Sequence, residues 1–137
     1  MTSPTEGDVW RYPYLWARQN AAGETEGRKA RPCVIAVALA SQADATRIFL
    51  LAVTSQPPGA NTAAIPVPDT EKRRAGLSVD IPLWVIIDEC NVDVVERSFY
   101  LEPTAKTGAV SDRFLRQVKA ALLDRLKSRE VGVVGRR

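Results

Sequence analysis

Histidine is absent from this chain of 137 residues. Its absence excludes nucleophilic triads that use a histidine base, and it excludes the common zinc sites built on histidine. Acid–base chemistry must then come from carboxylates, arginine, lysine, tyrosine or a hydroxyl group. The sequence also shows no cluster of other metal ligands, so we expect neither a metal nor a cofactor.

Cysteine is scarce, and long apolar runs are missing. Cys33 and Cys90 both lie in apolar, strand-like segments, which favours small buried side chains in a reducing cytoplasm. A disulfide or a reactive thiol is the alternative. No apolar run is long enough to cross a bilayer, and the first residues do not follow the pattern of a secretory signal. We therefore expect a cytoplasmic protein without a membrane partner.

The remaining composition is that of an ordinary globular protein. Hydrophobic residues make up 45% of the chain, charged residues make up 26%, and the formal net charge is +3. We expect one domain over residues 1–137. The small positive charge is compatible with an RNA or DNA partner but does not require one.

A basic segment leading into a strand is the most informative stretch. Arg28, Lys29 and Arg31 precede Pro32, and an apolar strand follows over Cys33–Leu39. Proline is tolerated at the start of a strand and pushes the residue before it into extended geometry. Arg31 is then held at the mouth of a strand, where a guanidinium can bind a phosphate through two hydrogen bonds. Alternatively, the basic residues form a loop tip that only keeps the strand soluble.

Aromatic residues occupy every second position near the N-terminus: Trp10, Tyr12, Tyr14 and Trp16. This period of two places them on one face of a strand predicted over Val9–Leu15. They either stack nucleobases or form one wall of a small barrel. Residues Ala17–Ala30 are predicted to form a long polar loop.

The middle of the chain predicts further short strands. Thr46–Thr54 follows Cys33–Leu39 closely enough to form a hairpin, and its end carries Thr54, Ser55 and Gln56. A short strand over Ala64–Val67 and a short helix over Asp69–Ala75 come next. Trp84–Val95 is predicted as one strand region with a polar face towards solvent, a partner or a ligand; its polar residues are Asp88, Glu89, Asn91 and Asp93.

The last helix has the clearest pattern. Ser111 is a favourable N-cap, and apolar residues then recur at every fourth position to about Lys127: Phe114, Val118, Leu122 and Leu126. Val131–Arg137 is predicted as a frayed tail. Several short strands followed by an amphipathic helix predict a mainly β (α+β) fold, a small antiparallel barrel with appended helices.

Three short motifs together resemble the MazF/PemK family of toxin–antitoxin ribonucleases. They are Gly7-Asp8-Val9-Trp10, Arg31-Pro32 leading into Val34-Ile35-Ala36-Val37, and Ala52-Val53-Thr54-Ser55-Gln56. The resemblance implies an SH3-like barrel, a homodimer and a cognate antitoxin protein. It also implies an endoribonuclease (an mRNA interferase) that cleaves single-stranded RNA by 2′-hydroxyl attack without a metal or cofactor.

The same resemblance assigns roles to individual residues. Arg31 corresponds to a phosphate-binding arginine, Thr54 to a neutral donor near that phosphate, and Asp88 to an acid–base residue. An aspartate paired with an arginine for structural reasons is the alternative for Asp88. The expected RNA-binding residues beside this catalytic group are Arg28, Lys29, Ser55 and Gln56.

The chain also departs from the family pattern. Where the PemK branch has Arg-x-Asp, this chain has Ile86-Ile87-Asp88, and the branch's histidine is missing. A catalytically degenerate, RNA-binding or regulatory member is therefore one alternative function. Another is a non-enzymatic gyrase-binding toxin like CcdB, which ends in Trp-Gly-Ile, whereas this chain ends in Val134-Gly135-Arg136-Arg137.

Overall fold

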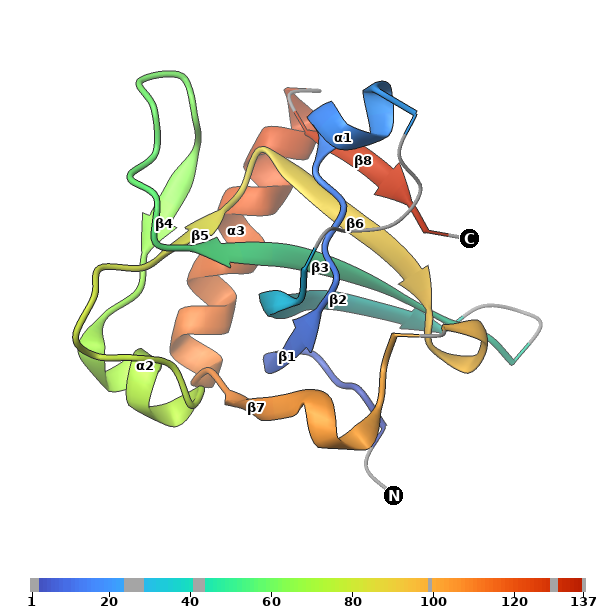
Figure 1. Ribbon diagram of the computed structural model, residues 1–137, viewed down its shortest axis with the longest axis horizontal. Coiled ribbons are helices and arrows are strands. Elements are labelled where there is room, and N and C mark those ends of the chain that lie inside the picture. Colours follow the sequence, from blue (N-terminus) through green and yellow to red (C-terminus); the bar gives the residue numbers. More distant parts are fainter. Residues whose placement is uncertain (1–2, 24–28, 41–43, 99, 129–130, 137) are drawn as a thin grey trace.

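A long hairpin lies at the centre of the sheet. The computed structural model describes residues 3–23, 29–40, 44–98, 100–128 and 131–136 (Figure 1). Strand β2 (Arg31–Ala40) runs antiparallel to β3 (Thr46–Thr54), with Cys33 opposite Ala52 and Ala40 opposite Thr46. The predicted hairpin is confirmed, and β2 extends over both Arg31 and Pro32.

The other strands extend this hairpin into an eight-stranded sheet of order β4-β5-β3-β2-β1-β7, with β6 paired to β3 and β8 paired parallel to β6. The added strands are β1 (Asp8–Tyr12), β4 (Ala64–Pro66), β5 (Trp84–Ile86), β6 (Glu89–Val94), β7 (Lys106–Ala109) and β8 (Gly132–Gly135). The predicted mainly β class is confirmed. Within the described part of the chain, the path of paired strands does not close into a ring.

Consecutive apolar residues of the hairpin supply two separate core clusters, because successive side chains of a strand point to opposite faces. Val34, Ala36, Leu51 and Val53 belong to one cluster, which also contains buried residues of the last helix. The residues next to them in the strands belong to the other cluster: Cys33, Ile35, Leu50 and Ala52. This second cluster also contains Trp10, Tyr12 and Tyr14. Burial on both faces explains why these strands read as nearly continuous apolar runs.

The longest helix among the described residues, α3 (Asp112–Lys127), packs against one face of the sheet. At its start, Ser111 Oγ accepts the Phe114 N–H at 3.2 Å, which confirms the predicted cap. Figure 1 shows α3 crossing behind the central strands. Helix α2 (Asp69–Arg74) is followed by Gly76, whose φ of +69° favours glycine. A Cβ at Gly76 would also clash with the Thr107 backbone.

Two segments predicted to lack regular structure contain some. Residues Ala17–Ala21 form the short helix α1, so the prediction of a polar loop over Ala17–Ala30 was wrong for this part. The segment predicted as a frayed tail contains β8. This strand pairs with β6, with Glu89 opposite Gly132 and Val92 opposite Gly135. Among the described residues there are also two single-turn 3-10 helices, η1 (Val95–Arg97) and η2 (Pro103–Ala105).

The region predicted as one strand, Trp84–Val95, consists of β5 and β6 with a break after Ile86. Two of its four polar residues are not open to a partner, because Asn91 is 0% exposed and Asp93 is 1% exposed, whereas Asp88 and Glu89 are half-buried. Asn91 bonds the backbone of Leu15, and the Asp93 carboxylate accepts the Tyr12 hydroxyl at 2.7 Å. These side chains are polar because they join segments inside the fold.

Both cysteines are free and buried, as predicted. Burial raises the pKa of the Cys90 thiol to about 11, which keeps it protonated and unreactive near neutral pH. In the described part of the chain, no helix has both the length and the apolar character needed to cross a membrane.

Candidate functional site

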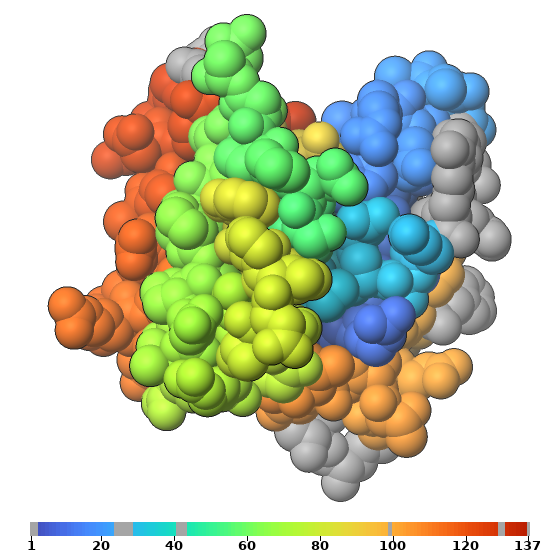
Figure 2. All heavy atoms as spheres, turned by 60° about the vertical axis from the view of Figure 1, so that its left-hand side comes forward, coloured from blue at the N-terminus to red at the C-terminus, as the bar shows by residue number. Residues whose placement is uncertain are grey.

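Two clefts meet at Arg31 and Thr54, which line both of them. The first, here the Lys29 cleft, has a volume of about 380 Å³, and its further lining includes Arg11, Lys29, Ser55, Leu77, Ile81 and Leu83. The second, here the Trp16 cleft, has a volume of about 280 Å³, and its further lining includes Trp16, Arg18, Gln56, Pro57, Pro58 and Ile86. In Figure 2 the blue atoms of α1 and the green atoms of the loop after β3 stand on opposite sides of a notch on this face.

The hairpin register brings the two shared residues together. Arg31 is the first residue of β2 and Thr54 is the last residue of β3. Since Cys33 pairs with Ala52, Arg31 and Thr54 each lie two residues further along, at the same end of the hairpin. The structure thus brings together the two residues that the sequence predicted at adjoining strand mouths.

Arg31 presents its guanidinium between the clefts. Its Cζ lies 5.0 Å from the centre of the Trp16 ring, a distance typical of a cation–π contact. Its Nε is buried and has no hydrogen-bond partner among the described residues. A buried N–H donor without a partner is costly, so an acceptor that reaches this nitrogen would supply a hydrogen bond that the described residues do not.

Thr54 is only 8% exposed, yet it reaches both clefts. Its Oγ1 accepts the backbone N–H of Gln56 at 3.0 Å. Because this bond uses a lone pair of the oxygen, the hydroxyl hydrogen remains free to donate. Ser55 and Gln56 are exposed and diverge, since Ser55 lines the Lys29 cleft and Gln56 lines the Trp16 cleft.

The charged residues that the structure describes in both clefts are all basic. Arg11, Lys29 and Arg31 line the Lys29 cleft, while Arg18 and Arg31 line the Trp16 cleft. No carboxylate is among the described residues that line either cleft. Such a surface attracts an anion, and guanidinium groups suit phosphate oxygens in particular.

The remaining predicted site residues are spread more widely. Lys29 is exposed in the cleft that carries its name, whereas Arg28 lies outside the described residues. Asp88 is half-buried between β5 and β6 and lines neither cleft. Its backbone carbonyl accepts the Gly132 N–H at 2.9 Å. The described residues contain no group of histidine, cysteine, aspartate and glutamate side chains able to hold a metal.

Sequence reasoning did not place three residues around the Trp16 cleft: Trp16, Arg18 and Glu89. Trp16 is the N-cap of α1, and Arg18 lies in its first turn, within the segment Ala17–Ala30 that was predicted as a loop. Glu89 holds that helix, because its Oε1 accepts the Ala17 N–H at 2.9 Å and the Tyr14 hydroxyl at 3.2 Å. Burial raises the pKa of the Glu89 carboxyl. The aromatic alternation drew attention to Trp16, but no sequence pattern placed it beside Arg31.

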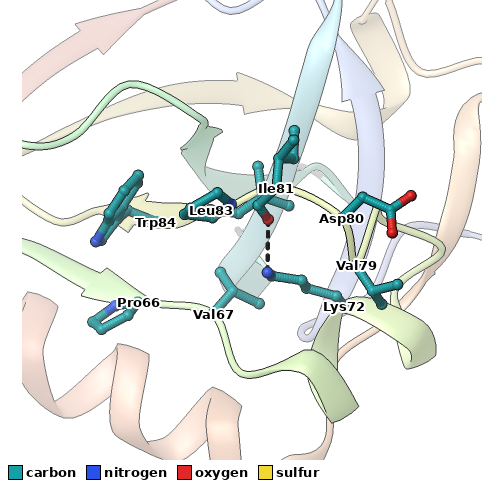
Figure 3. A pocket seen from close by; sticks show the side chains of 9 residues that line it. Pro66, Val67, Lys72, Val79, Asp80, Ile81, Leu83 and Trp84 are labelled. Carbon is teal, nitrogen blue, oxygen red and sulfur yellow. Dashed lines mark hydrogen bonds between the residues drawn. The ribbon is translucent and has the colours of Figure 1, made fainter.

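A third pocket, of about 350 Å³, lies next to the Lys29 cleft and shares Ile81 and Leu83 with it. Figure 3 shows Lys72 reaching across this pocket to the Ile81 carbonyl, which its Nζ contacts at 2.7 Å. The same ammonium pairs with Asp69 at 3.2 Å. Its charge is therefore already engaged within the protein, which makes this pocket a weaker anion site than the junction at Arg31.

Comparisons with known proteins assign no family. Neither the protein-family models nor the curated protein sequences contain a match to this chain.

Proposed function

We propose that the protein is an endoribonuclease toxin that cleaves single-stranded RNA without a metal. One observation carries the proposal: Arg31 and the Thr54 hydroxyl meet at the junction of two clefts whose described lining contains basic residues and no carboxylate. The resemblance of the three sequence motifs to the MazF/PemK family supports the same activity. An RNA strand that places a phosphate at this junction extends its neighbouring nucleotides into the two clefts.

The reaction begins with attack of a ribose 2′-hydroxyl on the adjacent phosphorus. A bond forms between phosphorus and the 2′-oxygen, and the bond to the 5′-oxygen of the next nucleotide breaks. The products are a 2′,3′-cyclic phosphate and a 5′-hydroxyl. Arg31 stabilises the charge that develops on the phosphoryl oxygens, and the Thr54 hydroxyl donates to one of them.

Two protons must also move in this reaction. A base takes the proton of the attacking 2′-hydroxyl, and an acid supplies a proton to the leaving 5′-oxygen. The resemblance gives this work to Asp88, which lines neither cleft in the free protein. Catalytic contacts often tighten only when substrate binds, so Asp88 stays the candidate acid–base residue.

RNA binding is assigned to the residues around the junction. Lys29, together with Arg28, attracts the sugar–phosphate backbone of the RNA. Ser55 and Gln56 contact the sugar or the base edge on either side of the bound phosphate. A cognate antitoxin and a homodimer are further proposals. Because Asn91 and Asp93 are buried inside one subunit, the polar side chains of β6 no longer support the dimer, which now rests on the resemblance alone.

A second candidate is an RNA-binding member without catalytic activity. The observation that favours it is the position of Asp88 outside both clefts, together with Ile86 in place of an arginine. Such a protein would bind single-stranded RNA at the Arg31 junction but would leave the phosphodiester bonds intact.

Incubation of the purified protein with a long single-stranded RNA in EDTA tests the proposal. Cleavage is expected to persist in EDTA and to leave 2′,3′-cyclic phosphate ends, while a fully double-stranded RNA of the same length remains uncut. Binding without cleavage would favour the second candidate. Cleavage that stops in EDTA and returns with magnesium would contradict the metal-free mechanism.

A further inference from the structure

A second arginine lines the same cleft as Arg31. We propose that Arg18 is a catalytic residue that binds the phosphate held by Arg31, so that two guanidinium groups grip one phosphoryl group in the Trp16 cleft. This inference rests on the proposed function and adds a residue to its site that neither the sequence motifs nor the resemblance assign.

Both arginines contact the indole of Trp16, and both line the Trp16 cleft. The Cζ atoms of Arg18 and Arg31 lie 5.3 Å and 5.0 Å from the centre of the same ring. Each contact restricts a long side chain that would otherwise sample many rotamers. Both guanidinium groups are thus ordered before an anion arrives, which lowers the cost of binding one.

The segment that carries Trp16 and Arg18 is itself fixed. Glu89 accepts the Ala17 N–H at 2.9 Å, directly between these two residues in the chain. One residue before Trp16, the Leu15 backbone N–H and carbonyl bond the Asn91 side chain at 2.9 Å and 2.7 Å. Arg18 therefore extends from an anchored turn towards the cleft.

The chemistry of the cleft calls for a second cation. Negative charge grows on the phosphoryl oxygens as the 2′-oxygen attacks, and preorganised donors aimed at that charge accelerate the reaction. No carboxylate is among the described lining residues of the cleft, and Glu89, which attracts Arg18, lies outside that lining. Ile86, which occupies the place of the PemK-branch arginine, lines the same cleft. Arg18 supplies from α1 the charge that Ile86 cannot supply from β5.

Single-turnover cleavage of a labelled RNA tests Arg18 directly. With saturating RNA, Arg18→Ala is expected to lower the rate by about 10²-fold, the lower end of the effect of removing one preorganised donor. Arg18→Lys is expected to restore little of this rate, because an ammonium cannot form two parallel bonds. Arg116→Ala removes an exposed arginine of α3 and is the matched control, with an unchanged rate expected. If wild type cleaves and Arg18→Ala cleaves equally fast, the Arg18 assignment is overturned and the proposed function stands.

Binding of a 2′-O-methyl RNA separates the two proposals, because this RNA lacks the attacking hydroxyl. Failure of wild type to cleave unmodified RNA would overturn the proposed nuclease activity. The binding assay would then still test whether Arg18 contacts the phosphate. Arg18→Ala is expected to weaken binding and to reduce the slope of log affinity against log salt by about 0.7, the contribution of one phosphate contact in a single strand. An unchanged affinity and slope would overturn the assignment of Arg18 to the phosphate site.

Discussion

Replacing Asn91 by leucine tests how the fold positions the site. The Asn91 side chain is 0% exposed and forms three hydrogen bonds: to the Leu15 N–H at 2.9 Å, to the Leu15 carbonyl at 2.7 Å and to Arg136 Nη1 at 2.9 Å. Leucine has a similar shape but no polar atoms. The variant therefore removes all three bonds while filling most of the same space.

The magnitude follows from the groups left without these bonds. A buried donor or acceptor that loses its partner costs about 1–3 kcal/mol, and Arg136 retains its bond to the Pro13 carbonyl at 2.9 Å. We expect Asn91→Leu to lower the free energy of unfolding by about 3–5 kcal/mol. Each kcal/mol corresponds to a shift in Tm of about 4 °C in a domain of this size.

Urea unfolding followed by circular dichroism measures this loss, with Asn61→Ala as the control. Asn61 is exposed, so its substitution is expected to change stability by less than about 0.5 kcal/mol. A loss below about 1 kcal/mol for Asn91→Leu would refute the reasoning, because it would mean that the Leu15 backbone finds other partners. Trp16 follows Leu15, so the same variant is expected to weaken RNA binding even where it remains folded.

Two further substitutions test local features of the fold. Burial raises the pKa of Glu89 above its ordinary value of 4.5, so the folded protein binds this proton more tightly than the unfolded chain does, and ionisation of Glu89 costs stability as the pH rises. The stability of Glu89→Gln relative to wild type is therefore expected to increase from pH 4 to pH 7 in urea titrations, and a difference independent of pH would contradict this. Gly76 has a φ of +69°, and an alanine there would also clash with Thr107, whereas Gly23 has a φ of +92° with nothing within 4 Å of an added Cβ. Gly23→Ala is therefore expected to lower the free energy of unfolding by about 1–2 kcal/mol, and Gly76→Ala is expected to lower it by more. Equal unfolding midpoints for the two alanine variants would show that the clash has no energetic weight.

Local patterns predicted the parts of the fold that depend on neighbouring residues. The hairpin of β2 and β3 followed from two apolar runs close in sequence, and α3 followed from Ser111 and a stripe of apolar residues with helical spacing. The meeting of Arg31 and Thr54 followed from the same hairpin, because its register places the start of β2 beside the end of β3. These features require no knowledge of distant contacts.

Features set by distant contacts were not predictable from the sequence. Asn91 and Asp93 read as an exposed polar face, but their partners Leu15 and Tyr12 lie more than 70 positions away in the chain, with separations of 76 and 81. The parallel pairing of β8 with β6 likewise depends on a long return of the chain. The contact of Arg18 and Arg31 with Trp16 belongs to this class, because it brings α1 against the start of β2. No local pattern encodes such pairs.

Single-turnover cleavage by Arg31→Ala, with RNA affinity measured separately, tests the central claim most directly. If Arg31 stabilises the reacting phosphate, the variant should cleave saturating RNA about 10²–10³-fold more slowly than wild type while its affinity falls much less. Arg31→Lys should not restore the rate, and Thr54→Val should show a smaller loss in the same direction. Cleavage by Arg31→Ala at the wild-type rate with saturating RNA would contradict the account and leave Arg31 as a basic residue that only attracts the RNA.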